Sequence, residues 1–376
     1  MKLYFEKVFE ASTLQIFFAL LFVSFCQSLL IILYSKYGLN RRALLDEAAV
    51  QSSHSGLVPR VGGIAVYLSI LIMFPLTIVF EFEIGKVSLI VISALPIFLT
   101  GLFEDLGYPM SSKKRLIAAA VSGLLVIIFV GIWVKYLSIP GIDQVLSYAP
   151  FGIAFTLFAT SGVVNAFNLI DGLNGLSSYV TISSAISLSI IAFEVGNFEI
   201  TFFLFFLFAI VFGFALLNFP FGKIFLGDAG AYACGHILVW TAVLLIWFHT
   251  EISPFAILLI FFWPVADTLL AIWRRWKLGS PADVPDRLHF HQLTMRFLEI
   301  RFLGRDMRRI TNPLATVILI PLISTPQVLG VLFWKHSGAT ILCTVTMGAL
   351  FVVTYLFGIN FAKKPRPLIK NEVEEN

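Results

Sequence analysis

The stretch EITFFLFFLFAIVFGFALL, residues 199–217, decides the fold class of this chain. Apart from Glu199 it is almost wholly apolar, and Phe, Leu and Ile would lie on every face of a helix. A helix needs about 20 mostly apolar residues to cross the hydrocarbon core of a bilayer. A strand of a membrane barrel would be shorter and would alternate in polarity. The stretch therefore predicts a membrane-spanning helix.

Similar apolar runs occur along the whole chain. Together they give about 11 candidate spans, at residues 14–34, 62–80, 87–103, 116–134, 151–166, 177–193, 199–217, 231–248, 254–272, 313–333 and 339–361. No internal repeat or low-complexity tract divides them. We therefore predict an all-α fold, a polytopic transmembrane helical bundle in which residues 1–376 form a single integral membrane domain.

The composition agrees with a membrane location. Of the 376 residues, 59% are hydrophobic and only 13% are charged, whereas soluble domains carry roughly a quarter charged residues. The three cysteines, Cys26, Cys234 and Cys343, lie far apart in apolar runs without CxxC spacing. This pattern indicates neither a disulfide framework nor a thiolate metal site. We expect the first apolar run to be a retained helix rather than a cleaved signal peptide.

The basic residues predict the orientation. With the N terminus outside, all but five of the 26 Lys and Arg residues fall on inner loops or the C-terminal tail. The outer ones are Lys2, Lys7, Lys86, Lys135 and Lys335. Positive residues concentrate on the cytoplasmic side of membrane proteins. We therefore predict an N-out, C-in topology.

The inner loops carry the polar residues that a simple connection would not need. The strongest signal is NAFNLIDGLNGLS, in which Asn165, Asn168, Asp171 and Asn174 recur every three to four residues. On a helix this spacing places amides and a carboxylate along one face. Such a stripe must face protein, water or a ligand rather than lipid. It predicts a binding site, with a hydrogen-bonded seam between helices as the alternative.

Two other inner loops add carboxylates. Glu104 and Asp105 end the third candidate span in GLFEDLGYPMSSKKRL, and acids at the membrane edge are costly enough to indicate function. Asp228 lies in GDAG just before the eighth span. A carboxylate in a glycine loop at a helix start can hold a cation while free N–H groups face an anion. By itself GDAG is a weak motif.

Basic and glycine residues accompany these acids. HSGLVPRVGG contains Arg60 and the pair Gly62 and Gly63, which would allow close approach of backbone to a ligand or of one helix to another. A plain turn into the second span explains it equally well. Lys113, with the two basic residues that follow it, fits either phosphate binding or ordinary anchoring at the membrane surface.

The longest inner loop, about 273–312, contains PDRLHFHQL with Arg287, His289 and His291. An H-x-H pair is compatible with zinc. No Cys accompanies it, however, and the other candidate ligands are hard oxygens, which suit Mg²⁺ better. We interpret the histidines as phosphate contacts or proton-handling groups. The stretch 292–309 has the pattern of an amphipathic interfacial helix.

Together the inner loops supply what phosphoryl transfer requires: carboxylates for Mg²⁺, cations that spread charge, and backbone close to phosphates. The main rival is a transporter or flippase of lipid-linked or anionic solutes, which would break its helices near mid-span and carry an inverted repeat. The polar groups here lie at the ends of spans, and no repeat is visible. The pattern favours a membrane-embedded enzyme.

Taken in order, HSGLVPRVGG, GLFEDLGYPMSSKKRL, NAFNLIDGLNGLS, GDAG and PDRLHFHQL resemble the polyprenyl-phosphate N-acetylhexosamine-1-phosphate transferases (glycosyltransferase family 4). This family includes the undecaprenyl-phosphate GlcNAc-1-phosphate transferases and the phospho-MurNAc-pentapeptide translocases. The resemblance implies transfer of an N-acetylhexosamine 1-phosphate from a UDP-sugar to undecaprenyl phosphate, with release of UMP, to start a lipid-linked surface glycan such as O-antigen lipopolysaccharide.

The resemblance also implies residue roles. The catalytic candidates are Asp105, Glu104, Asp171 and Asp228. The substrate-binding candidates are Asn168, Asn174, His289, His291, Arg287, Lys113 and Arg60. The metal candidates are Asp228 and Asn165, with Mg²⁺ as the cofactor and Mn²⁺ as a substitute. The expected partners are undecaprenyl phosphate, a UDP-N-acetylhexosamine, membrane lipids and a second copy in a homodimer, with no nucleic acid. The expected location is the bacterial inner membrane, with the site facing the cytoplasm.

Two positions depart from the family pattern. The usual aspartate pair is Glu104–Asp105 here, which leaves either acid as the candidate base, with Asp105 favoured. The usual third histidine is Gln292. These features favour a sugar-1-phosphate transferase of a surface-polysaccharide pathway over the pentapeptide translocase, and leave the identity of the sugar open.

Overall fold

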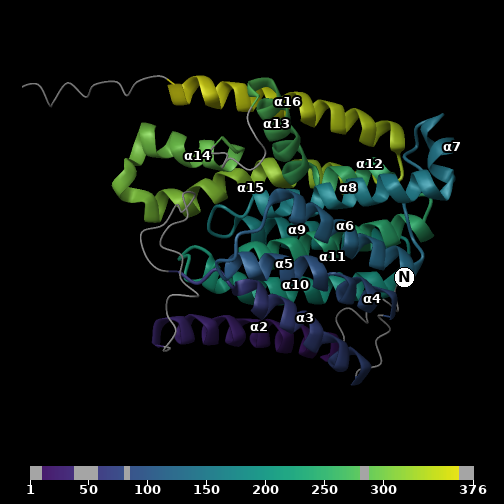
Figure 1. Ribbon diagram of the computed structural model, residues 1–376, viewed down its shortest axis with the longest axis horizontal. Helices are drawn as coiled ribbons and strands as arrows, with labels where there is room; N and C mark the ends of the chain where they lie inside the picture. The colour runs from purple at the N-terminus through teal and green to yellow at the C-terminus, as the bar shows by residue number, and fades with distance from the viewer. Residues whose placement is uncertain (1–10, 38–57, 80–84, 280–287, 364–376) are drawn as a thin grey trace, which may run out of the picture.

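The computed structural model describes residues 11–37, 58–79, 85–279 and 288–363, and within these ranges it contains helices and no strand (Figure 1). The long helices run roughly parallel, with α7 at one end of the bundle and α14 at the other. The helices are α2 (Ala11–Tyr37), α3 (Gly62–Val79), α4 (Gly85–Ser93), α5 (Leu95–Asp105), α6 (Ser112–Val130), α7 (Ile142–Ser147), α8 (Ala149–Leu169), α9 (Leu176–Glu194), α10 (Phe198–Asn218), α11 (Gly227–Phe248), α12 (Pro254–Ile260), α13 (Phe262–Leu278), α14 (Phe290–Leu298), α15 (Arg308–Leu332) and α16 (Ser337–Lys363). The predicted helical class is confirmed.

The predicted spans all fall on helices, but they are not all equally able to cross a membrane. Among the described residues, eight helices are long and apolar enough, and a ninth span results if the bent pair α12 and α13 counts as one. Helix α3 is shorter, and α6 begins with three basic residues. The multi-pass class is therefore supported, while the count of eleven and the N-out orientation stay predictions.

Helix α11 forms the centre of the bundle. It packs against α3, α5, α8 and α9, and nearly all of its residues are buried. Helix α10 lies against α2 and α9, whereas α16 is mostly exposed along its length. Since lipid cannot hydrogen-bond a helix terminus, a helix buried so completely must find partners for its ends within the protein.

The predicted span 254–272 is not one continuous helix. Helices α12 and α13 meet at Phe261 at an angle of 81°. Pro264 has no N–H for the carbonyl of Ile260, and its ring would clash with that carbonyl in a straight helix. The carbonyl of Ile260 instead accepts from Nε2 of Gln327 on α15, at 3.1 Å. The bend turns the second half, α13, away from the line of α12, and Asp267 of α13 contacts the first residue of α14.

The segment after α13 also differs from expectation. The stretch predicted as one amphipathic helix at 292–309 is divided into α14, a short π-helical segment (Glu299–Leu303) and a 3₁₀ turn (Arg305–Met307). Gly304 separates the π-helical segment from the 3₁₀ turn, and its φ is +74°. The buried side of α14 packs against α15 and α16.

Helices α2 and α10 approach each other closely at Gly213. A Cβ atom added there would lie 2.3 Å from the backbone oxygen of Leu21. Real Cβ atoms are not found so close to a backbone oxygen, so any larger residue must push α2 away.

We therefore predict that Gly213→Ala lowers the thermal stability of the protein in detergent, by about 1–3 kcal/mol of overpacking. The matched control is Gly162→Ala on α8, where nothing lies within 4 Å of the added atom and Ala is the better helix former. Thermal unfolding of both variants tests the packing. Equal midpoints for the two would contradict it.

Candidate active site

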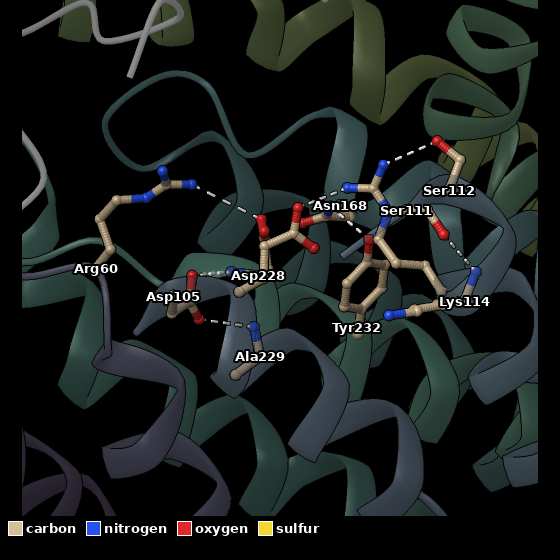
Figure 2. Close-up of polar contacts among 11 residues, drawn as sticks. Arg60, Asp105, Ser111, Ser112, Lys114, Asn168, Asp228, Ala229 and Tyr232 are labelled. Atoms are coloured by element: carbon tan, nitrogen blue, oxygen red, sulfur yellow. Dashed lines mark hydrogen bonds and ion pairs between the residues drawn. The ribbon is translucent and has the colours of Figure 1, made fainter. Parts of the chain in front are cut away.

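The first turn of α11 is held by carboxylates from two other segments, of which Figure 2 shows Asp105. Asp105, at the end of α5, accepts from the amides of Asp228 and Ala229, both at 2.9 Å. Asp171, in the loop after α8, accepts from the amide of Gly227 at 3.1 Å. The first amides of a helix have no partner within the helix and carry its partial positive charge. Two predicted acids thus fix the position of the third, Asp228.

This arrangement requires backbone to approach backbone. A Cβ atom at Gly101 on α5 would lie 2.5 Å from the amide nitrogen of Ala229, and one at Gly63 on α3 would lie 2.3 Å from that of Gly230. The paired glycines of the first inner loop therefore bring helices together, which was one of the two interpretations offered for them.

The Asp228 carboxylate faces Arg60, from the segment that leads into α3. Their Nη2 and Oδ1 atoms are 3.8 Å apart, and the two side chains are 34% and 14% exposed (Figure 2). The main chain beside Arg60 is fixed, since the Phe225 amide donates to the Pro59 carbonyl at 2.9 Å. Asp228 and Arg60 thus form a partly accessible pair of opposite charges at the surface of the cluster.

Glu104 is paired differently from its neighbour Asp105. Its Oε1 atom accepts from Nη1 of Arg115 at 2.9 Å, while Arg115 also donates to Ser112 at 3.0 Å. Its Oε2 atom is buried and has no hydrogen-bond partner among the described residues. Lys113 lies exposed in the first turn of α6, the helix that also carries Arg115.

The amides of the NAFNLIDGLNGLS motif have different environments. Asn168 donates to the hydroxyl of Tyr232 at 2.9 Å, and its Oδ1 atom is buried without a hydrogen-bond partner among the described residues (Figure 2). Asn165 donates to the carbonyl of Ser161 on its own helix at 2.8 Å. Asn168 therefore points into the acidic cluster, whereas the amide nitrogen of Asn165 is used within α8.

Asn174 belongs to a frame that holds the loop at 170–175. Its amide nitrogen Nδ2 donates to the Pro220 carbonyl at 2.9 Å, and its backbone N–H donates to Asn312 at 2.7 Å. Asn218 accepts from the Gly175 amide at 2.7 Å. Since Asn174 is only 3% exposed, these contacts shape the loop that carries Asp171.

His291 lies beside this loop, and the ring of His289 stacks on the ring of His291. A Cβ atom at Gly172 would be 2.5 Å from Nε2 of His291. Both ring systems face Asp267 of α13, with Nδ1 of His289 3.0 Å and Nδ1 of His291 3.8 Å from its Oδ2 atom. The structure therefore brings the predicted histidine loop to the predicted acidic loop. Arg287 lies outside the described residues.

Burial dominates the electrostatics of the loops. It raises the pKa of Asp171 to about 7, although the charge of Arg60 opposes this. It lowers the pKa of His291, although Asp267 opposes this. In both groups the charged form is disfavoured because water is excluded. A cation entering the cluster would stabilise the ionised carboxylates.

The oxygen atoms of the cluster are of the kind that a divalent metal would bind. Within the described residues, no three His, Cys, Asp or Glu side chains form a ready metal cage. Mg²⁺, however, is usually held by one or two carboxylates together with substrate phosphates and water. Asp228 is partly exposed, and two buried acceptor atoms, Oε2 of Glu104 and Oδ1 of Asn168, have no hydrogen-bond partner. These hard oxygen atoms fit such a site.

Some residues of the site were missed from sequence. Tyr232, Asn218 and Asn312 act through contacts between distant segments, and no local pattern reveals them. Asp267 had a signal: it is an acid within the apolar run 254–272, and acids inside candidate spans indicate function by default.

An all-helical membrane bundle with a carboxylate-rich polar cluster at one end defines an integral membrane protein with a candidate phosphate-handling site. The model of glycosyl transferase family 4 matches residues 87–246, a range that includes all four predicted catalytic acids. The chain is 30% identical over 258 residues to the undecaprenyl-phosphate alpha-N-acetylglucosaminyl 1-phosphate transferase of Escherichia coli (strain K12), a match that spans 67% of this chain and 69% of that protein. It is 27% identical over 283 residues to the probable undecaprenyl-phosphate N-acetylglucosaminyl 1-phosphate transferase of Bacillus subtilis (strain 168), spanning 73% of this chain and 77% of that protein.

The chain belongs to glycosyl transferase family 4, and the resemblance inferred from its five motifs is confirmed. Arg60, Asp267 and both histidines lie outside the range of the family match, so their place in the site rests on the geometry given above.

We predict that Asp105→Ala destabilises the protein by about 0.5–2 kcal/mol, because two amides at the buried start of α11 lose their acceptor. The control is Lys113→Ala, which removes an exposed charge at the same end of the bundle and should change stability by no more than about 0.5 kcal/mol. Thermal unfolding in detergent measures both. A midpoint for Asp105→Ala equal to that of the wild type would show that the cap contributes nothing.

Proposed function

We propose that the protein transfers an N-acetylhexosamine 1-phosphate from a UDP-sugar to undecaprenyl phosphate and releases UMP. The observation that carries the proposal is the pair of Asp228 and Arg60 at the capped start of α11. Asp228 offers a partly exposed anion for a metal, and Arg60 offers a cation for a phosphate 3.8 Å away. The names of the two relatives described above include undecaprenyl phosphate and N-acetylglucosaminyl 1-phosphate.

In the proposed reaction, a phosphate oxygen of undecaprenyl phosphate bonds to the β-phosphorus of the UDP-sugar. The bond from that phosphorus to the bridging oxygen breaks, and its electron pair leaves on UMP. A phosphate monoester is largely dianionic near pH 7, so the attacking oxygen carries no proton. The main demand on the site is to hold two anions together and to stabilise the charge that moves onto UMP.

The residues divide this work by position. Arg60 and Lys113 would attract phosphates, and the histidines beside Gly172 would contact the diphosphate of the donor. Asp228, with Asn165 and the unpartnered oxygen atoms of the cluster, would hold Mg²⁺ or Mn²⁺, and the ion would supply positive charge that neutralises the charge developing on UMP. Asp105 has both oxygen atoms engaged by α11 and Glu104 is paired with Arg115. This geometry favours positioning roles for both acids over that of a general base.

We further propose that the site faces the cytoplasm of the bacterial inner membrane, where UDP-sugars are made, and that the product starts a lipid-linked surface glycan. The two ends of the bundle support this orientation. At the end with α7, Lys86, Lys135 and Lys335 each lie over an aromatic ring, Phe248, Trp247 and Trp334 respectively. Trp is enriched at both interfaces of a membrane, so these contacts mark one interface without giving its side, and the proposed orientation rests on the arginines, which gather at the other end.

Purified protein with undecaprenyl phosphate, Mg²⁺ and UDP-GlcNAc should release UMP, which a coupled phosphate assay measures over a panel of UDP-sugars. Asp228→Asn should reduce release at least about 100-fold, because a charge that stabilises the transition state is lost. Its thermal midpoint should change little, because the Asp228 side chain is not used in capping.

The matched control is Glu251→Gln, the same loss of charge at the opposite end of the bundle, and it should keep its activity. Omitting the divalent ion should stop release, and Mn²⁺ should restore it. UMP release that survives Asp228→Asn would place the chemistry elsewhere. Absence of release from every donor by folded wild-type protein would overturn the proposed function.

Orientation is tested with single cysteines that are introduced one at a time into a variant lacking the native cysteines. The native cysteines lie in apolar helices and therefore do not report on either end of the bundle. Lys335→Cys, next to Trp334, should react with a membrane-impermeant maleimide in spheroplasts. Lys113→Cys, at the start of α6, should react only after lysis. The reverse result would invert the topology, and labelling of both in intact spheroplasts would refute the span assignment between them.

A further inference from the structure

Asp267 is an acid buried on the apolar helix α13, with only 2% of its side chain exposed. Its carboxylate has three neighbours, all from the loop and first turn at α14. Oδ1 accepts from the backbone N–H of Phe290 at 3.0 Å. Oδ2 lies 3.0 Å from Nδ1 of His289 and 3.8 Å from Nδ1 of His291. One carboxylate therefore contacts the whole His-Phe-His segment.

The chemistry of these contacts selects a tautomer. An ionised carboxylate can only accept hydrogen bonds, and the Phe290 amide is already a fixed donor to it. The short contact to His289 therefore requires the proton on Nδ1, which leaves Nε2 as the ring nitrogen available to a ligand. A hydrogen bond at one ring nitrogen commonly sets the role of the other in this way.

The surrounding packing holds this geometry in place. Phe290 packs against Trp263 and Phe351, with ring centroids 4.8 and 5.2 Å away, and those two rings also contact each other. The two histidine rings are stacked, 5.7 Å apart and inclined by 16°. Because both rings are at most 5% exposed, neither can turn over without breaking these contacts.

The loop at 170–175 lies on the other side of the pair. Nε2 of His291 is so close to Gly172 that an added Cβ atom would be 2.5 Å away. The pair is thus fixed by Asp267 through Nδ1 and directed by Nε2 of His291 toward the loop that carries Asp171.

We propose that Asp267 is the positioning residue of the histidine pair. It holds His289 in the Nδ1–H tautomer, and it keeps the stacked rings in the position that places His291 against the 170–175 loop. That the oriented rings then contact the donor diphosphate rests on the function proposed above. Asp267 itself acts through the histidines and touches no substrate. A purely structural role, as a polar tie between α13 and α14, is the alternative that the experiment must separate.

The first measurement is independent of activity. Protein labelled with ¹⁵N only in histidine contains six such residues, and His289→Gln identifies the signals of His289. In the wild type, at a pH where the ring is neutral, Nδ1 of His289 should be protonated and Nε2 unprotonated. The opposite tautomer in folded wild-type protein would overturn the proposal without any Asp267 variant.

The second measurement uses Asp267→Asn. The amide oxygen can keep the Phe290 contact, which turns the NH₂ group toward Nδ1 of His289 and should reverse its tautomer. The matched control is Glu299→Gln. Glu299 is also a buried acid (6% exposed) and accepts from Arg308 at 2.8 Å, but it lies at the C-terminal end of α14, whereas the histidines lie at its start. The control should keep the wild-type histidine spectrum. An unchanged spectrum in Asp267→Asn, or the same change in both variants, would reduce Asp267 to a structural tie.

The activity arm follows once wild-type protein releases UMP. Asp267→Asn should lower kcat/KM for the UDP-sugar by roughly 10–100-fold, the usual effect of losing a residue that orients a functional histidine. KM for undecaprenyl phosphate should stay within about threefold, and Glu299→Gln should behave as wild type. If the wild type released no UMP, the proposed function would fail while the spectra still decided the role of Asp267. Equal loss in Asp267→Asn and Glu299→Gln would contradict the positioning role.

Discussion

The free amides at the start of α11 are the constraint on which the site depends. Helix α11 is buried along nearly its whole length, so its first N–H groups reach neither lipid headgroups nor bulk water. Asp105 and Asp171 satisfy three of them from two separate segments. Each acid is thereby held to a backbone position instead of moving on a flexible loop. The end of α5, the loop after α8 and the start of α11 consequently share one geometry.

This capping also explains the electrostatics of the cluster. Glu104, Asp105, Asp171 and Asp228 gather at one helix terminus, where Arg60 and Arg115 supply the opposing side-chain charges among the described contacts. The helix dipole offsets part of the repulsion, but burial still raises the pKa of Asp171 to about 7. A cluster of this kind gains stability from a cation that enters it. The proposed binding of a metal ion and the repulsion among the gathered acids would therefore be two aspects of the same arrangement.

The sequence predicted those features that leave a local trace. Apolar length identified the helices. The spacing of Asn165, Asn168, Asp171 and Asn174, and the glycines beside Asp228, identified loops that meet. Contacts between distant segments left no such trace. The bend at Phe261 required both Pro264 within the run and a partner for the freed carbonyl, which Gln327 provides from α15. Likewise, no local pattern shows that Asn174 shapes its own loop: its N–H groups donate to the backbone of Pro220 and the side chain of Asn312, while its Oδ1 atom is buried without a hydrogen-bond partner among the described residues. Its role as a substrate-binding residue stays a prediction.

The two ends of the bundle use basic residues in different ways, and this difference refines the meaning of the charge count. At the site end, Arg115 and Arg308 lie 2.9 and 2.8 Å from buried or half-buried glutamates. Arginine suits this role because its planar fork remains charged and matches a carboxylate. In pairs this close the carboxylate neutralises most of the arginine charge, so the arginine attracts a phosphate weakly. The Arg60–Asp228 pair is longer, at 3.8 Å, so a metal on Asp228 and a phosphate on Arg60 can replace the contact between them with two stronger ones. In the proposed topology, the charge asymmetry would orient the bundle through many basic residues, whereas the proposed binding of substrate anions would depend on a few partly exposed ones such as Arg60.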